Sequence, residues 1–302
     1  MELAMIGLGR MGANMAERLL KGGHRVIAFD TNPDAVALMR DKGAVPAASI
    51  KQAAEAQSRP RVFWIMVPAG QPVDDVLTAL YAVAEGGDVL VDGGNSYYRE
   101  TLRRAADASM RKLRYVDVGT SGGIWGLAEG YSMMVGGDKE TVELLRPALE
   151  TLAPSRDRGW GHVGASGAGH FVKMVHNGIE YGMMQSYAEG FSILQHKGDF
   201  ELDLHQISEI WRCGSVVRSW LLDLMSEALG ENPGLAGIAP YVADSGEGRW
   251  TLAEAMDLNV PAPAITAALL ERLRSREVDS FADRLLSVTR NKFGGHAVKK
   301  GD

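Results

Sequence analysis

The sequence predicts an α/β fold, in which an N-terminal Rossmann-type doubly wound parallel sheet is followed by an all-α C-terminal domain. In the first half, short apolar runs alternate with amphipathic helical patterns, an order typical of a parallel sheet with helices on both faces. After about Gly164 the strand patterns stop, and helical patterns alone follow. We therefore expect a sheet domain over residues 1–163 and a helical domain over residues 164–302.

The expected strands of the sheet domain are short and apolar, and they lie at residues 3–6, 25–29, 61–67, 89–92, 115–118 and 132–135. The helical patterns between them cover residues 14–21, 34–42, 73–83 and 99–111. In the helical domain such patterns cover residues 166–196, 203–213, 215–229, 250–257, 261–275 and 279–292. Proline and glycine interrupt them near residues 233, 240 and 261, which separates the helices.

The composition is that of an ordinary globular protein. Hydrophobic residues make up 46% of the chain and charged residues 23%, and the formal net charge of −6 does not suit a nucleic-acid or anionic-membrane partner. No run approaches the roughly 18 apolar residues of a membrane span. The single cysteine, Cys213, cannot form an intramolecular disulfide, so we expect a cytoplasmic protein. The histidine and acidic residues show no spacing typical of metal ligands, so we expect no metal.

A glycine motif follows the first expected strand and opens the first helix. It has the form G-x-G-x-x-G and comprises Gly7, Leu8, Gly9, Arg10, Met11 and Gly12. In this context the first glycine permits a tight turn, the second lets the backbone approach a pyrophosphate, and the third allows close helix–strand packing. We therefore expect the motif to bind a dinucleotide, the alternative being a plain glycine turn.

Further candidate residues lie where other strands end. Asp30 ends the second expected strand, where a carboxylate accepts hydrogen bonds from a ribose and repels a 2′-phosphate; this favours NAD over NADP. Two more segments follow the next strands, and we expect cofactor contacts from Val67, Pro68, Ala69 and Asn95. Either segment could instead be a plain turn.

The most informative segment is residues 164–181, where small residues lead into a helix. Lys173, His176, Asn177, Glu180 and Tyr181 fall on one stripe of this helix, and most of its other positions are apolar. This pattern predicts a buried helix that lines a cavity with a base, an acid and hydrogen-bonding groups. A solvated face with a charge pair is the alternative, and His176 alone could be a core histidine.

Taken together, these motifs resemble the β-hydroxyacid dehydrogenase superfamily, and more narrowly the short-chain form of the decarboxylating 6-phosphogluconate dehydrogenases. The resemblance rests on the glycine motif, on Gly119-Thr-Ser-Gly-Gly123 and on Gly167-Ala-Gly-His-Phe-Val-Lys173. The narrower signature is His176-Asn-Gly-Ile-Glu-Tyr181, with Asp92-Gly-Gly-Asn-Ser96 and the tail Arg290-Asn-Lys-Phe-Gly-Gly-His296.

The resemblance implies a role for each matching residue. Lys173 would be the general base and Glu180 the general acid. The residues expected to bind substrate are Asn95, Ser121, Gly122, Gly123, His176, Asn177, Tyr181, Arg290 and His296. Arg290 and His296 would reach the active site of a neighbouring subunit, so we expect a homodimer or homotetramer.

The implied reaction is the oxidative decarboxylation of 6-phosphogluconate, a phosphorylated sugar acid, to ribulose 5-phosphate and CO₂ with reduction of NAD. An ordinary lysine, with a pKa of about 10.4, is a poor base at neutral pH, so Lys173 must be partly neutral in its pocket. The alternatives are a non-decarboxylating NAD-dependent dehydrogenase of a small β-hydroxyacid, similar to 3-hydroxyisobutyrate, and an inactive NAD-sensing protein.

Two features depart from the long members of the family. Phe29-Asp30-Thr31-Asn32 lacks the arginine that would hold an NADP phosphate. The loop Ser245-Gly-Glu-Gly-Arg-Trp250 has a serine where the family has a phosphate-binding lysine, with Arg249 as a candidate replacement.

Overall fold

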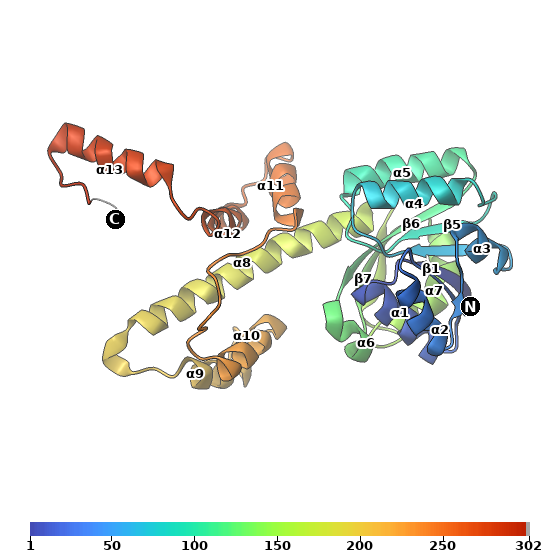
Figure 1. Ribbon diagram of the computed structural model, residues 1–302, viewed down its shortest axis with the longest axis horizontal. Helices are drawn as coiled ribbons and strands as arrows, with labels where there is room; N and C mark the ends of the chain where they lie inside the picture. Colours follow the sequence, from blue (N-terminus) through green and yellow to red (C-terminus); the bar gives the residue numbers. More distant parts are fainter. Residues whose placement is uncertain (300–302) are drawn as a thin grey trace. The chain divides into compact units, whose positions relative to one another are not determined.

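The computed structural model describes residues 1–299, apart from the side chain of Phe293, and the chain forms two compact units. The first unit is Met1–Asn177 and the second begins at Gly178, so the division falls inside one long helix, α8 (Ala168–His196) (Figure 1). The expected domain boundary between residues 163 and 164 falls before the last residue of β8 (Trp160–Gly164), and it stays a prediction. Residues 300–302 of the expected helical domain lie outside the described residues.

Among the described residues, eight strands form one sheet in the order β3-β2-β1-β4-β5-β6-β7-β8. Their bounds are β1 (Glu2–Ile6), β2 (Arg25–Phe29), β3 (Val45–Pro46), β4 (Val62–Ile65), β5 (Val89–Asp92), β6 (Arg114–Ser121), β7 (Ser132–Gly137) and β8 (Trp160–Gly164). The order places β1 in the middle with successive strands added on either side, which is the doubly wound arrangement. The predicted fold class is confirmed.

The sheet departs from the expectation at one edge. Strands β1 to β6 are parallel, but β7 pairs antiparallel to β6, with Val118 opposite Val135, and β8 then runs parallel to β7. The connection from β6 to β7 holds only η1 (Gly123–Trp125) and α6 (Gly126–Glu129), and this is too short for the crossover that a parallel pair requires. The sequence patterns missed β3, which has two residues, and β8, which carries glycines and His162 instead of an apolar run.

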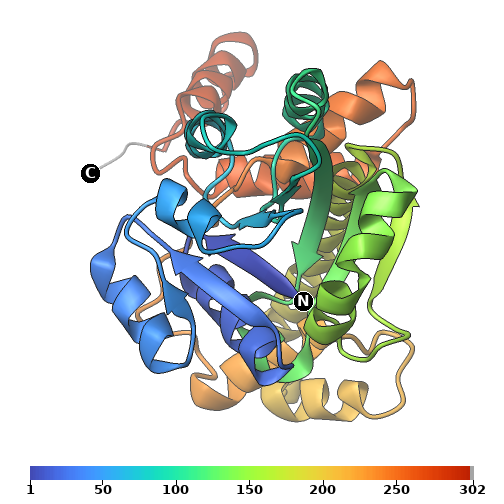
Figure 2. The same cartoon turned by 90° about the vertical axis from the view of Figure 1, so that its right-hand side faces the viewer.

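Helices cover both faces of the sheet (Figure 2). The core on one face involves α1 (Arg10–Lys21), α2 (Pro33–Asp41) and α7 (Lys139–Leu152), and the core on the other involves α3 (Ile50–Glu55), α4 (Gln71–Tyr81) and α5 (Tyr98–Met110). Successive residues of β1 alternate between the two cores: Leu3 and Met5 belong to the first, Ala4 and Ile6 to the second. Both cores need apolar strands, which explains why the central strands are apolar throughout.

The second unit is helical in its described part. Its elements after α8 are η2 (Gly198–Phe200), α9 (Leu204–Arg212), α10 (Trp220–Glu231), α11 (Glu247–Asp257), α12 (Pro263–Arg274) and α13 (Phe281–Gly294). A small core forms around Phe191, Leu222 and Leu229. Several apolar side chains of α8, including Val172, Ile179 and Met183, are exposed. The expectation of a helix buried on all its apolar faces is therefore wrong for the single chain, because its described elements leave these side chains uncovered.

None of the described helices combines the length and the apolar character needed to cross a membrane.

Candidate active site

The glycine motif forms a tight loop between β1 and α1 that leaves room for a ligand at one position. Gly7 has φ +96°, and a Cβ there would lie 2.5 Å from the Met66 carbonyl oxygen. A Cβ on Gly12 would lie 2.1 Å from the Gly7 carbonyl oxygen, whereas a Cβ on Gly9 would meet nothing within 4 Å. Gly7 and Gly12 are thus required by the fold itself. The open space at Gly9 fits the approach of a dinucleotide pyrophosphate to the start of α1.

Asp30 stands beside this loop and holds it from the end of β2. Its Oδ2 accepts a hydrogen bond from the Leu8 backbone N–H at 2.6 Å, and its Oδ1 accepts one from the Asn32 N–H at 2.8 Å. The carboxylate is half-buried, so part of it stays accessible. This arrangement suits the ribose of a dinucleotide. Arg10 and Met11, also expected at the cofactor, begin α1, where Arg10 is exposed and Met11 half-buried.

Gly9→Ala is expected to weaken NADH binding by at least about tenfold without lowering thermal stability, because the new methyl group enters only ligand space. Gly9 has φ −60° and ψ −179°, which alanine adopts freely. The measurements are the dissociation constant for NADH, from fluorescence titration, and the melting temperature. Gly12→Ala is the matched control, and it should lower the melting temperature because its methyl group meets backbone. Unchanged NADH affinity in Gly9→Ala would contradict the assignment of this loop.

The remaining expected residues of the sheet unit gather at the carboxyl edge of its parallel strands. Val67, Pro68 and Ala69 follow β4, and Asn95 follows β5. Ser121 ends β6, and the two residues after it, Gly122 and Gly123, both have positive φ. Because parallel strands end at the same edge, these segments surround the same region as the glycine motif. The buried Oδ1 of Asn95 has no hydrogen-bond partner among the described residues.

A buried aspartate fixes the start of α8 on the sheet. Asp117, in β6, has no exposed surface; its Oδ1 accepts a hydrogen bond from the Gly167 N–H at 2.7 Å and its Oδ2 one from the His170 N–H at 2.9 Å. The helix lies directly against the strand, since a Cβ on Gly119 would lie 2.4 Å from the Cβ of Lys173. Asp117 and Gly119 thereby determine where Lys173 stands.

The first turns of α8 bring three expected active-site residues together. Lys173 is 5% exposed, and its Nζ lies 3.3 Å from Nδ1 of His176. The same Nδ1 lies 3.0 Å from Oδ1 of Asn177. A single hydrogen on Nδ1 can serve only one of these contacts, so the tautomer of His176 is tied to whether Lys173 donates. His176 is exposed, so it is not the buried core histidine considered as an alternative.

The second unit holds the rest of the helix and a polar cluster around Tyr181. Glu180 is half-buried and lies two turns after Lys173 on the unbroken helix α8. The Tyr181 hydroxyl lies 3.1 Å from Oγ of Ser245. The guanidinium carbon of Arg272, on α12, lies 3.5 Å from the centre of the Tyr181 ring, a cation–π arrangement.

Arg249 does not stand ready as the replacement for the missing lysine. Its Nε lies 2.5 Å from Oδ2 of Asp244, a nearly buried carboxylate, so its charge is already paired. A cation that contacts Tyr181 is Arg272, whose Nη1 also donates to the Ala243 carbonyl oxygen at 2.7 Å. The sequence analysis missed Arg272, because it lies far along the chain from Tyr181 and belongs to no motif. Asp117 could have been noticed in the sequence, because it is a single acidic residue inside an otherwise apolar strand.

The tail residues lie at and after the end of the last helix. Arg290 lies within α13, inside the expected helical pattern of residues 279–292, and it is exposed; the helix continues to Gly294, two residues beyond that pattern. His296 follows the helix; its carbonyl oxygen accepts a hydrogen bond from Nδ2 of Asn291 at 2.8 Å. Within residues 1–299, no group of three or more histidine, cysteine or acidic residues is placed to hold a metal ion.

A doubly wound sheet with a glycine loop at its carboxyl edge, and a lysine-bearing helix anchored beside it, defines a Rossmann-type oxidoreductase. A family model described as the NAD binding domain of 6-phosphogluconate dehydrogenase matches residues 2–164, and one described as the C-terminal domain of that enzyme matches residues 169–300. The chain belongs to the 6-phosphogluconate dehydrogenase family.

Individual proteins similar to this chain carry the name of the same family. The chain is 45% identical to the NAD(+)-dependent, decarboxylating 6-phosphogluconate dehydrogenase of Haloferax volcanii over 100% of both chains. It is 32% identical to the decarboxylating 6-phosphogluconate dehydrogenase of Escherichia coli, covering 100% of this chain and 66% of that one. The solved 6-phosphogluconate dehydrogenase of Plasmodium falciparum has a TM-score of 0.84 at 25% identity, over 100% of this chain and 67% of that chain.

A more distant structure, the 3-hydroxyisobutyrate dehydrogenase of Mycobacterium tuberculosis, has a TM-score of 0.71 at 24% identity over 88% of this chain and 90% of that chain, which shows the fold alone.

Proposed function

We propose that this protein oxidises and decarboxylates 6-phosphogluconate to ribulose 5-phosphate and CO₂ while reducing NAD. The observation that carries the proposal is α8, which holds Lys173, His176 and Asn177 at the sheet and continues unbroken to Glu180 and Tyr181. A dehydrogenase of a small β-hydroxyacid would need neither a second acid such as Glu180 nor the remote cationic residues Arg290 and His296. The matches to 6-phosphogluconate dehydrogenases over the whole chain support the same reading.

NAD is the proposed cofactor, with NADP disfavoured. The glycine loop and Asp30 would hold its adenosine half, and Val67, Pro68, Ala69 and Asn95 would line the path of its nicotinamide half. The Asp30 carboxylate would repel a 2′-phosphate. The relative from Haloferax volcanii is named as NAD(+)-dependent, which supports this choice. When bound, NAD would supply the hydride acceptor for oxidation at C3 of the substrate.

Lys173 performs the proton transfer that accompanies oxidation. Its neutral amine takes the proton from the 3-hydroxyl, and its buried position keeps competing water away from Nζ. The 3-keto acid that results has a carboxylate β to the carbonyl and loses CO₂. The ammonium that Lys173 has then become stabilises the developing enolate oxygen. Glu180 delivers the last proton, to C1 of the enediol.

The substrate phosphate would be held in the helical unit. Arg272 supplies the positive charge, and the hydroxyl groups of Tyr181 and Ser245 supply hydrogen bonds. A guanidinium is suited to phosphate because its N–H groups can bind two oxygens at once. Ser121, Gly122 and Gly123, with Asn95, His176 and Asn177, would contact the sugar acid near its carboxylate and reacting hydroxyl.

We further propose that the enzyme is a cytoplasmic homodimer or homotetramer in which Arg290 and His296 complete a neighbour's site. Both side chains are exposed in the single chain. Mixing Arg290→Ala with Lys173→Ala under conditions that exchange subunits should restore activity. Proven exchange without recovery would mean that each tail serves its own chain.

The function is tested by following NADH formation and CO₂ release with 6-phosphogluconate, with NAD and NADP in parallel, and with 3-hydroxyisobutyrate as the alternative substrate. We expect NADH and CO₂ in equal amounts from 6-phosphogluconate and a higher kcat/KM for NAD. Oxidation without CO₂ release would favour the small-hydroxyacid alternative, and no turnover would favour the NAD-sensing one.

A further inference from the structure

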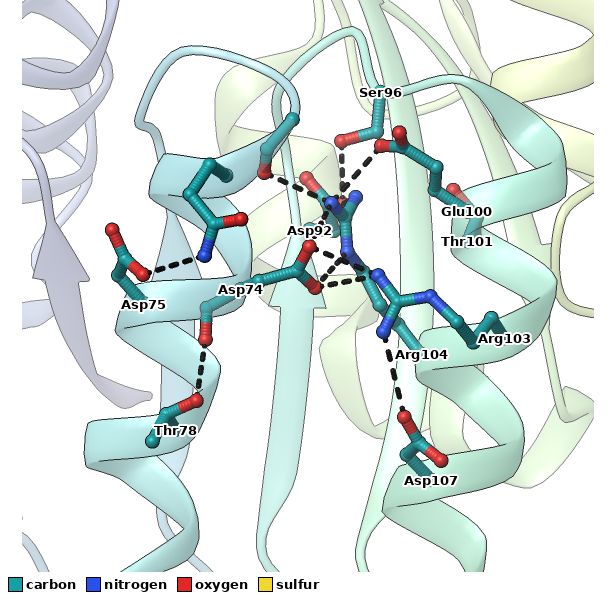
Figure 3. Close-up of polar contacts among 12 residues, drawn as sticks. Asp74, Asp75, Thr78, Asp92, Ser96, Glu100, Thr101, Arg103, Arg104 and Asp107 are labelled. Carbon is teal, nitrogen blue, oxygen red and sulfur yellow. Dashed lines mark hydrogen bonds and ion pairs between the residues drawn. The ribbon is translucent and has the colours of Figure 1, made fainter.

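An arginine without exposed surface lies between α4 and α5, behind the carboxyl edge of the sheet. Arg104, on α5, donates from Nε to Oδ1 of Asp74 at 2.9 Å and from Nη2 to Oε2 of Glu100 at 3.0 Å. Its Nη2 also donates to the Gly70 carbonyl oxygen at 3.0 Å, and its Nη1 lies 3.8 Å from Oδ2 of Asp92. Figure 3 shows the guanidinium of Arg104 at the centre of these acidic side chains.

Two of these partners belong to loops that the proposed function assigns to the cofactor. Gly70 ends the segment Val67–Gly70 after β4 and is the residue from which α4 begins, with φ +88°. Asp92 ends β5 and begins the segment that contains Asn95. One side chain therefore faces both segments: it donates a hydrogen bond to Gly70 and lies opposite the carboxylate of Asp92.

Asp92 is paired with Arg104 by charge at 3.8 Å, without a hydrogen bond from Nη1, and it organises its own segment through hydrogen bonds. Its Oδ2 accepts hydrogen bonds from Oγ of Ser96 at 2.8 Å and from the Tyr115 hydroxyl at 3.1 Å. Burial, followed by the charge of Asp92, raises the pKa of Tyr115 well above its usual range, so Tyr115 remains a donor to this carboxylate. Ser96 is the residue next to Asn95, so the carboxylate of Asp92 holds the end of the Asn95 segment.

The contacts require an arginine and not merely a positive charge. Two nitrogens of the rigid guanidinium reach Asp74 and Gly70 on one side while the third faces Asp92 on the other. A lysine ammonium is a single point of charge on a flexible stem and cannot span these partners together. The hydrogen bond from Arg104 is the main cause that lowers the pKa of Asp74 below its usual value.

We propose that Arg104 is a positioning residue that fixes the segments Val67–Gly70 and Asp92–Ser96 at the spacing the bound dinucleotide requires. It touches neither cofactor nor substrate. The proposal rests on the proposed function in that these segments are taken to contact the cofactor. It predicts that loss of the arginine geometry weakens cofactor binding even when the positive charge is kept.

Arg104→Lys is the decisive variant, because it keeps a positive charge among the three carboxylates. Arg104→Met would instead leave their negative charge without a buried counter-charge. Arg103→Lys is the matched control. Arg103 is the adjacent residue on α5 and also pairs with Asp74, at 2.8 Å, but it has no hydrogen bond to either loop in the structure as described. Each variant is compared with the full-length wild-type protein for melting temperature, NADH dissociation constant, and KM and kcat.

We expect Arg104→Lys to raise the dissociation constant for NADH and the KM for NAD by about tenfold or more, and to lower kcat, since small displacements of positioning groups have effects of this size. Arg103→Lys should leave all three within about twofold. If Arg104→Lys binds NADH as the wild type does, even with a lower melting temperature, Arg104 is only structural and the proposal is overturned. NADH binding is measured without substrate and therefore tests Arg104 independently of the reaction. A wild-type protein that binds NADH but releases no CO₂ would contradict the proposed function and leave the proposal for Arg104 standing.

Discussion

Replacing Lys173 with methionine is expected to lower kcat by roughly 10³–10⁴-fold, because the variant loses the proposed general base and the cation proposed to stabilise the enolate. Methionine matches the length and apolar stem of lysine, so the packing against Gly119 is retained. The measurement is the pre-steady-state formation of NADH after rapid mixing with 6-phosphogluconate. We expect the burst to disappear, since the proton of the 3-hydroxyl has no acceptor.

Glu180→Gln provides the contrast on the same helix. Glutamine keeps the size and polarity of the side chain but cannot deliver a proton to C1, so the steady-state rate should fall while a burst of NADH remains. Equal loss of the burst in both variants would contradict separate roles for the two residues. A full steady-state rate in Glu180→Gln would mean that another group supplies the last proton.

Asp117→Asn is expected to destabilise the protein by about 2–4 kcal/mol and to reduce activity beyond the loss of folded protein. The amide can accept only one of the two backbone hydrogen bonds, and its NH₂ group then faces a buried N–H. The start of α8 must shift to relieve this, and Lys173 shifts with it. Chemical denaturation gives the free energy of unfolding, and activity is measured per folded molecule.

Asp138→Asn is the matched control for this variant. Asp138 also accepts a backbone hydrogen bond at the start of a helix, from Thr141 at 3.1 Å in α7, but its carboxylate is exposed and asparagine is an equally good capping residue. We expect a change in unfolding free energy of less than about 0.5 kcal/mol and normal activity. A similar loss of stability in both variants would show that the burial of Asp117 is not what makes it essential.

The sequence allowed the central part of the fold to be predicted because local pattern and tertiary environment agree there. The strands β2 and β5 were predicted at their observed bounds, since a buried parallel strand must be apolar on both faces. Where burial depends on partners distant in the chain, the pattern is weak: β8 forms only because β7 offers it an edge. The antiparallel direction of β7 follows from the short connection between β6 and β7, and the apolar patterns of the strands do not encode strand direction.

The candidate site was predictable to a similar extent. Residues on one helix, such as Lys173, His176 and Asn177, share a stripe that can be read from their spacing. Arg272 and Tyr181 come together through the packing of α8 and α12, and no local pattern indicates it. In the sequence, Arg104 is one of several charged residues on an amphipathic helix. Its burial depends on neighbouring elements that cover it, and the pattern of its own helix does not reveal them.

The continuity of α8 also limits how the chain can change in evolution. Lys173 and Glu180 lie on one unbroken helix, and their separation along it is set by the number of residues between them. Inserting or deleting one residue between them would turn Glu180 by about 100° around the helix axis and move it off the face that carries Lys173. Changes of length should therefore be absent between these two positions in active descendants of this chain, while the segments that join α9, α10 and α11 can lengthen or shorten without altering the spacing of the reacting groups.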